Sequence, residues 1–79
     1  MWELGAFNKE TGMIVREYVL RRVDGPMLKE LLDIDDSEYP IWAAQHDIPW
    51  KMVEKLAPYV EGDFVADDTL DYELGYSRD

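Results

Sequence analysis

The chain contains no cysteine, and His46 is the only histidine among its 79 residues. Without thiols the protein forms neither disulfides nor thiolate metal sites. The sequence also lacks any apolar run near the ~18 residues that a membrane-spanning helix needs. Its first residues, Met1-Trp2-Glu3, do not begin a signal peptide. These absences lead us to expect an intracellular protein of the cytoplasm that has no membrane partner.

The length limits how large a core the chain can form. Seventy-nine residues correspond to a single domain, residues 1–79, near the lower end of sizes that sustain their own core. A chain of this size buries only ~60% of the surface that it exposes when unfolded. Hydrophobic residues make up 47% of the sequence, which is enough for a compact fold. A deep, enclosed active site is nevertheless hard to build.

Basic residues are scarce and unevenly placed. Eight lysines and arginines face eighteen acidic residues, which gives a formal net charge of −10. Residues 1–32 hold five acids and five bases, whereas residues 33–79 hold thirteen acids and three bases. Such a field repels nucleic acid and anionic membranes and attracts basic proteins. The alternative is that the acidic residues serve only to keep the protein soluble, although solubility does not require them to be concentrated in one part of the chain.

Residues 61–76, EGDFVADDTLDYELGY, hold six carboxylates and no lysine or arginine. The second half of this segment alternates between apolar and polar positions, and its apolar positions are Leu70, Tyr72, Leu74 and Tyr76. A period of two residues indicates a strand with one buried face. We therefore expect a final strand that packs these four side chains and displays Asp71 and Glu73 to solvent.

The first part of the chain indicates a β-hairpin. Residues 2–7 predict a short strand, and residues 8–12 a turn that Asn8 begins and Gly12 closes. Residues 13–21 are then the returning strand, because Val, Ile and Tyr are concentrated there. A helix over residues 13–21 is the alternative, since several apolar residues also share a helical stripe. As a strand, this segment has apolar residues on both sides, which predicts a central place in the sheet.

Two helices are expected between the hairpin and the final strand. Asp24 precedes Pro26 as a helix cap, and Leu28, Leu31 and Leu32 form the buried side of a first helix. Between these helices we expect an acid-rich connection over residues 33–38 and a short helical turn over residues 39–44. Asp47 and Pro49 repeat the cap signal for a second helix ending near Pro58. The expected architecture is α+β, a three-stranded, mainly antiparallel sheet with two or three short helices on one face.

The carboxylates fit no specific metal or catalytic pattern. Asp33, Asp35 and Ser37 have the spacing that opens a calcium loop. That loop needs Gly at its sixth position and Glu at its twelfth, where this chain has Glu38 and Ala44. Acid pairs at glycosidase spacing are expected by chance among eighteen acids, and no Ser-His-Asp set or phosphate-binding Gly loop exists. We therefore predict no enzyme activity, no metal or other cofactor and no small-molecule substrate.

Protein recognition is the remaining class of function, because the net charge opposes nucleic-acid binding. Aromatic and acidic residues are interleaved along the second part of the chain. Interfaces favour Trp and Tyr, and acids orient a basic partner. For the aromatic residues, core packing is the alternative. The candidate partner-binding residues are Asp35, Asp36, Glu38, Tyr39, Trp42, Asp63, Asp67, Asp68, Asp71 and Glu73.

From about Phe7 to Tyr76 the order of short motifs resembles a bacterial family. The motifs are NKETG, IVREYVL, LKELLDIDD, YP, DIPWKMVEKLAPYV and LDYELGY. This order resembles small acidic immunity proteins of contact-dependent growth inhibition and other polymorphic toxin systems. The resemblance implies a stoichiometric inhibitor, without a catalytic motif, of a nuclease toxin domain in a larger secreted or surface effector. A nuclease presents a basic groove that an acidic inhibitor can occupy.

A second interpretation uses the same acidic surface. The chain would then be a phage- or plasmid-encoded inhibitor that mimics nucleic acid and blocks a host defence effector, such as a restriction or CRISPR enzyme. Genomic context separates the two: an upstream toxin gene favours immunity, and phage genes favour mimicry.

Overall fold

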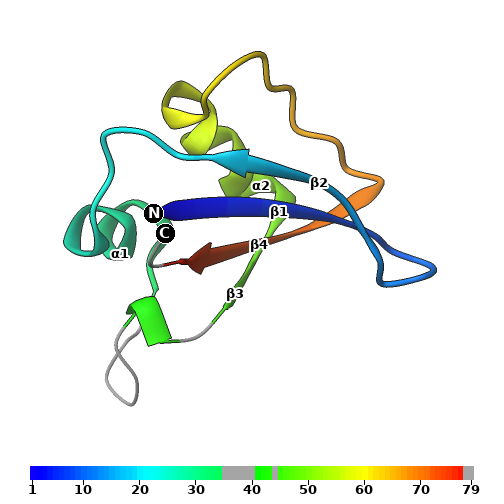
Figure 1. The fold of residues 1–79 in the computed structure, drawn as a ribbon, viewed down its shortest axis with the longest axis horizontal. Coiled ribbons are helices and arrows are strands. Elements are labelled where there is room, and N and C mark those ends of the chain that lie inside the picture. The colour runs from blue at the N-terminus through cyan, green and yellow to red at the C-terminus, as the bar shows by residue number, and fades with distance from the viewer. Residues whose placement is uncertain (35–40, 44, 78–79) are drawn as a thin grey trace.

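The computed structural model describes residues 1–34, 41–43 and 45–77. Within these residues four strands, two α-helices and two 3₁₀ helices follow one another along the chain (Figure 1). Their order is β1 (Trp2–Asn8), β2 (Ile14–Val19), α1 (Gly25–Leu32), η1 (Ile41–Ala43), β3 (His46–Ile48), α2 (Trp50–Val53), η2 (Glu54–Tyr59) and β4 (Leu70–Tyr76). No helix in the described ranges is long and apolar enough to cross a membrane.

The strands form one antiparallel sheet in the order β2-β1-β4-β3. Its two central strands are the first and the last among the described residues, and they pair from Trp2 opposite Tyr76 to Asn8 opposite Leu70. The expected α+β class with a mainly antiparallel sheet is confirmed. The expected number of three strands was wrong, because the described residues include a fourth strand, β3.

β3 lies where the sequence suggested a helix cap. His46–Ile48 pairs with β4 and places Asp47 opposite Glu73, so Asp47 belongs to a strand. The helix itself is confirmed, but α2 begins at Trp50, and its N-cap residue Pro49 makes no side-chain cap bond. The helix continues as η2 through Pro58 to Tyr59. The fixed φ of proline starts the helix at this point without a side-chain acceptor before it.

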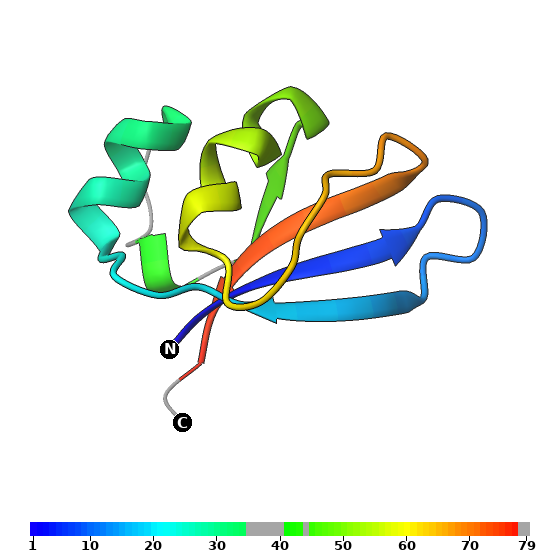
Figure 2. The same cartoon turned by 90° about the horizontal axis from the view of Figure 1, so that it is seen from above.

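The helices α1, α2 and η2 cover one face of the sheet, and no element of the described residues covers the other, which we call the open face (Figure 2). The covered face buries Leu4 and Ala6 from β1 and Tyr72 and Leu74 from β4. The helices contribute their own buried side chains to the same core, among them Leu28, Leu32, Val53 and Leu56. Within the described part of the chain no charged residue is buried, so the charges lie on the surface.

β2 is an edge strand, which corrects the expected central position. Apolar side chains on both sides of a strand suggested a strand in the middle of a sheet that is covered on both faces. In this sheet the described helices cover one face, and β2 is the outermost strand. Met13, Ile14 and Val15 are accordingly 70%, 49% and 54% exposed. The register between β1 and β2 shifts between Ala6 and Phe7, which leaves Val15 without an opposite residue, as in a β-bulge. The choice of strand over helix for this segment is confirmed over Ile14–Val19.

The hairpin turn and the first helix form as their local signals predict. In the turn, Oδ1 of Asn8 accepts hydrogen bonds from the N–H groups of Glu10 and Thr11, and Gly12 has a φ of 70°. At the start of α1, Oδ1 of Asp24 accepts a hydrogen bond of 2.9 Å from the N–H of Met27. Both elements therefore depend on side chains that satisfy nearby backbone donors.

The segment between η2 and β4 crosses the helix-covered side of the sheet. Phe64 packs edge to face between Tyr18 and Tyr72, with ring centroids 4.8 Å and 6.2 Å apart. The N–H of Asp67 donates a hydrogen bond of 2.8 Å to the Tyr72 hydroxyl oxygen. We call residues 61–69 the acidic loop. It is anchored to the core side of the sheet, away from the open face (Figure 2).

Candidate protein-binding surface

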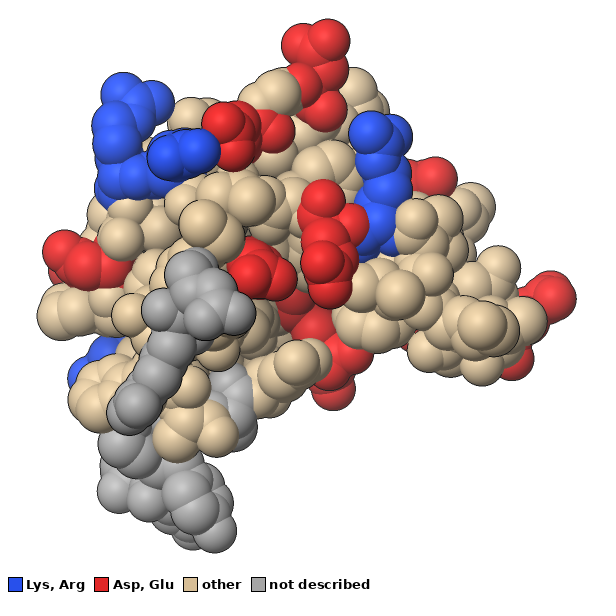
Figure 3. Space-filling view, viewed as in Figure 1, with Lys and Arg blue, Asp and Glu red and all other residues tan. Residues whose placement is uncertain are grey.

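The open face of the sheet gathers acids from all four strands. In β1 the buried residues Trp2, Leu4 and Ala6 alternate with half-buried ones, so Glu3 points to the open side. The register places the remaining acids on that side as well. We call this surface the acidic sheet face and define it by Glu3, Glu17, Asp47, Asp71 and Glu73. Figure 3 shows acidic side chains gathered over the centre of this face, with basic side chains around them.

One row of residues crosses the whole sheet. Gly5 lies opposite Glu17 of β2 on one side and opposite Glu73 of β4 on the other. Glu73 in turn lies opposite Asp47 of β3. Neighbouring strands are ~4.8 Å apart, so three carboxylates occupy a row of about 15 Å. Like charges directly opposite one another destabilise a sheet, which makes this row costly to fold.

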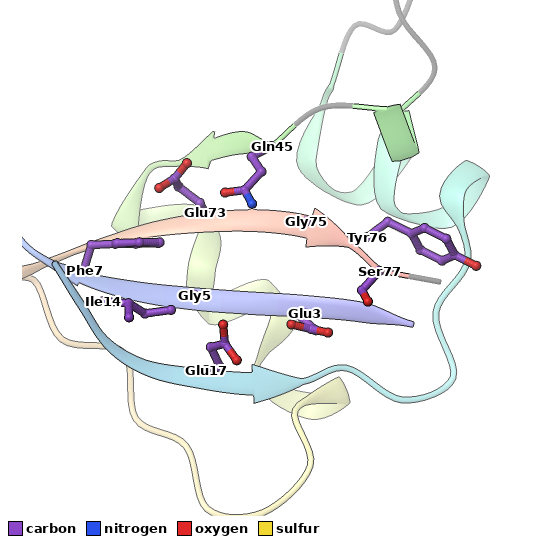
Figure 4. A pocket seen from close by; sticks show the side chains of 10 residues that line it. All are labelled: Glu3, Gly5, Phe7, Ile14, Glu17, Gln45, Glu73, Gly75, Tyr76 and Ser77. Carbon is purple, nitrogen blue, oxygen red and sulfur yellow. The ribbon is translucent and has the colours of Figure 1, made fainter. Parts of the chain in front are cut away.

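A depression of about 110 Å³ lies over the row, and Figure 4 shows the side chains that line it. Its floor includes Gly5 and Gly75, and its walls carry the carboxylates of Glu3, Glu17 and Glu73. A Cβ atom on Gly5 would approach Cε2 of Phe7 to 2.9 Å, so the glycine allows the Phe7 ring to lie across the strand. Among the described residues, none that lines the depression is a lysine or an arginine. The depression therefore presents negative charge beside an apolar ring.

An aromatic groove adjoins the acidic sheet face. It is lined by Trp2, Trp42, Tyr76 and Pro26, together with neighbouring residues at the start of α1. Trp42 is 59% exposed, and the rings of Trp2 and Tyr76 meet edge to face with centroids 4.9 Å apart. Tyr76 lines both the groove and the acidic depression. The two features are thus continuous on the surface.

The candidate residues that were named from the sequence do not all lie on one surface of the structure. Asp71 and Glu73 lie on the acidic sheet face, as the alternation of β4 predicted, with Asp71 exposed and Glu73 half-buried. Trp42 is exposed in the aromatic groove. By contrast, Asp63, Asp67 and Asp68 belong to the acidic loop on the other side of the sheet. The four remaining candidates, Asp35, Asp36, Glu38 and Tyr39, lie outside the described residues.

Sequence reasoning missed three members of the acidic sheet face, Glu3, Glu17 and Asp47. A signal for Glu3 was present, because it alternates with the apolar residues of the first strand. Glu17 and Asp47 had no comparable signal, since their position depends on the strand order. Tyr76, expected in the core, is 43% exposed at the end of β4, where it lines the aromatic groove.

Other polar groups serve local structure. The Nε2 of His46 lies 2.8 Å from the carbonyl oxygen of Ile41 and donates a hydrogen bond to it. Oδ1 of Asp67 accepts bonds from the hydroxyl and the N–H of Thr69, and these bonds hold the pKa of the Asp67 carboxyl below its usual value. In the described ranges, no three His, Cys, Asp or Glu side chains are grouped so that they could hold a metal ion.

Comparison with known proteins identifies the family of the chain. Residues 1–75 match the family described as Domain of unknown function (DUF7683), and the chain belongs to this family. No curated protein and no solved structure matches the chain.

Proposed function

We propose that this DUF7683 domain is a cytoplasmic immunity protein without enzymatic activity that binds and neutralises a nuclease toxin domain of a larger secreted or surface effector. The observation that carries the proposal is the acidic sheet face, where five carboxylates from four strands share one uncovered surface. The opposite face is occupied by the helices and the core. The open face is therefore the surface that combines negative charge with room for a partner.

The charge on this face suits a basic groove. A nuclease must hold phosphates with lysine and arginine, and those side chains would lie against the Glu17, Glu73 and Asp47 row in the complex. Acids of this kind mainly accelerate association, whereas tight binding needs buried anchors. Trp42 and Tyr76, at the edge of the acidic sheet face, belong to the residue types that most often supply such anchors.

The test compares two triple variants with the same change in net charge. The face variant carries Glu17→Gln, Asp71→Asn and Glu73→Gln. The loop variant carries Asp63→Asn, Asp67→Asn and Asp68→Asn, on the other side of the sheet. The proposal predicts a nuclease toxin domain encoded by a neighbouring gene. Each variant is co-expressed in bacteria with that domain, and growth and the association rate are measured.

The face variant is expected to lose protection and to associate ~10-fold or more slowly at low salt, whereas the loop variant keeps both. Equal losses in the two variants would assign the effect to total charge and contradict a role for the face. If both variants protect the bacteria fully from the toxin, the binding surface lies elsewhere on the protein. Inhibition of a restriction or CRISPR effector, with no effect on a toxin, would support nucleic-acid mimicry instead.

A further inference from the structure

The outer edge of β2 is open over the first four of its six residues. Ile14–Glu17 is exposed throughout, and among the described strands β2 has a sheet neighbour only on its β1 side. The following residues are covered, because the N–H of Glu61 donates to the carbonyl of Val19 and the N–H of Arg21 donates to the carbonyl of Tyr59. An exposed strand edge with apolar side chains is a template for a further strand unless it is protected.

The direction of the backbone groups follows from the bonds at the covered end. The carbonyl of Val19 points away from β1, toward Glu61, whereas the N–H of Leu20 points toward β1 and donates to Trp2. Backbone groups alternate in direction along a strand, so the N–H and C=O of Glu17 also point away from β1. No described residue bonds to them from the outer side. Glu17 therefore offers one free donor and one free acceptor.

We propose that this edge binds an extended, basic segment of the protein partner as a fifth, antiparallel strand. The inference rests on the proposed function and specifies how the partner is held. A residue opposite Glu17 would lie on the acidic sheet face, where a lysine or arginine side chain is favoured by Glu17 and by Glu3 of the neighbouring strand. The main-chain bonds would supply affinity, and the alternating side chains would supply specificity.

The two faces of the added strand would differ in chemistry. Its other side chains would lie on the side of Arg16 and Tyr18, where the Arg16 guanidinium is 5.5 Å from the centroid of the Tyr18 ring. On that side Tyr18 is half-buried against Phe64 of the acidic loop, so the surface next to the strand edge is aromatic, and Arg16 is the nearest charge on β2 itself. The segment that fits is therefore one in which basic and apolar residues alternate, with the basic residues on the acidic sheet face.

A second copy of the chain fits this edge poorly. An antiparallel pair related by a two-fold axis places one residue opposite its own copy. The registers centred on the exposed stretch place Arg16 against Arg16 or Glu17 against Glu17, and like charges directly opposite are unfavourable. The register centred on Val15 places the bulge in the middle of the ladder, where pairing is disrupted.

The probe is a fluorescent peptide of about eight residues, the length of an ordinary strand, in which lysine and valine alternate. Two isomers carry N-methyl groups, one on every lysine nitrogen and the other on every valine nitrogen. In an antiparallel pair, the residue opposite Glu17 directs its own N–H at Glu17. Methylation of the lysines should therefore weaken binding at least ~10-fold, whereas methylation of the valines should change it less than ~2-fold.

Binding is measured by fluorescence anisotropy, and hydrogen exchange supplies a second readout. The Glu17 amide should exchange rapidly in the free protein and become protected when the unmethylated peptide binds. Equal binding of both methylated isomers, or an unprotected Glu17 amide in the complex, would overturn strand addition. A dimer in sedimentation experiments that excludes the peptide would assign the edge to a second copy and also overturn the proposal.

Different experimental results would contradict the proposed function and the proposed strand addition. If the face variant loses protection but the methylated isomers bind equally, the proposed function stands and strand addition falls. If the peptide isomers differ as expected but the face variant protects fully, strand addition stands and the role of the acidic sheet face in toxin binding falls.

Discussion

Replacing Glu73 with glutamine is expected to raise the free energy of unfolding, although it alters a half-buried residue of a central strand. Glu73 lies opposite Asp47 on one side, and beyond Gly5 it faces Glu17 on the other. No residue lining the depression around it, in the described ranges 1–34, 41–43 and 45–77, carries a positive side-chain charge. The variant removes a charge while keeping the shape and most of the hydrogen-bonding capacity of the side chain.

The size of the gain follows from Coulomb's law. Residues directly opposite on neighbouring strands have Cβ atoms ~5 Å apart, so carboxylates ~6 Å apart in water repel by about 0.7 kcal/mol. Glu17 lies two strands away, and at ~10 Å it adds about 0.4 kcal/mol. Side-chain movement and repulsion in the unfolded chain reduce this sum. We expect a gain of ~0.5–1 kcal/mol at 0.01 M salt, where the Debye length is ~30 Å.

The assay is urea denaturation, since urea leaves the ionic strength under control. At ~1 M salt, where the Debye length is ~3 Å, the gain should fall below ~0.3 kcal/mol. Asp68→Asn, which removes the same charge from the acidic loop, is the matched control and should change stability by less than ~0.5 kcal/mol. A loss of stability in Glu73→Gln at low salt, or a gain that salt does not reduce, would refute charge repulsion across the sheet.

Three further predictions concern the core, the first helix and the pH dependence. Leu74 is fully buried, so Leu74→Ala should cost ~2–5 kcal/mol of unfolding free energy in urea, whereas Val65→Ala at an 86% exposed position should cost less than ~0.5 kcal/mol; similar costs for the two would contradict the assigned core. Asp24→Ala should cost ~1 kcal/mol and Asp24→Asn much less, because the side chain caps α1; equal losses would show that charge, and not the cap bond, is responsible. Burial raises the pKa of Tyr72 above 10, so the neutral phenol contributes stability that is complete below pH 10 and is lost as the pH rises through the folded pKa. Tyr72→Phe should be less stable than the original protein at pH 7, because it leaves the Asp67 N–H without its acceptor. The difference should shrink at higher pH in thermal unfolding, because only the original protein loses stability as the phenol ionises; a constant difference would contradict this linkage.

The elements that the sequence predicted are those with a complete local signal. The turn at Asn8, the start of α1 at Asp24 and the alternation of β4 each depend on residues within a few positions of one another. Such patterns act through nearby backbone groups or through one buried face, so they remain visible without knowledge of the fold. Their places in the structure agree with the prediction.

The missed features depend on partners that are distant in sequence. β3 has three residues, too few for a periodic pattern, and it is a strand because it pairs with Glu73 and its neighbours about 26 positions later. The edge position of β2 could not be read from its apolar residues, since it depends on the order in which all the strands pair in the sheet. For the same reason the sequence grouped Asp71 with Asp67 by proximity, whereas the sheet groups it with Glu3 and Glu17.

The pairing of the first strand with the last has a consequence for how the protein folds. Leu4 and Leu74 are opposite one another although they are seventy positions apart, and the other β1–β4 pairs have similarly large separations. Folding slows as such distant contacts come to dominate a structure. During synthesis β1 can find β2 early, but a two-stranded hairpin is at best marginally stable in water. The core-facing side of β1 therefore stays unpaired with β4 until Leu70–Tyr76 has been synthesised, and only then can the domain fold cooperatively.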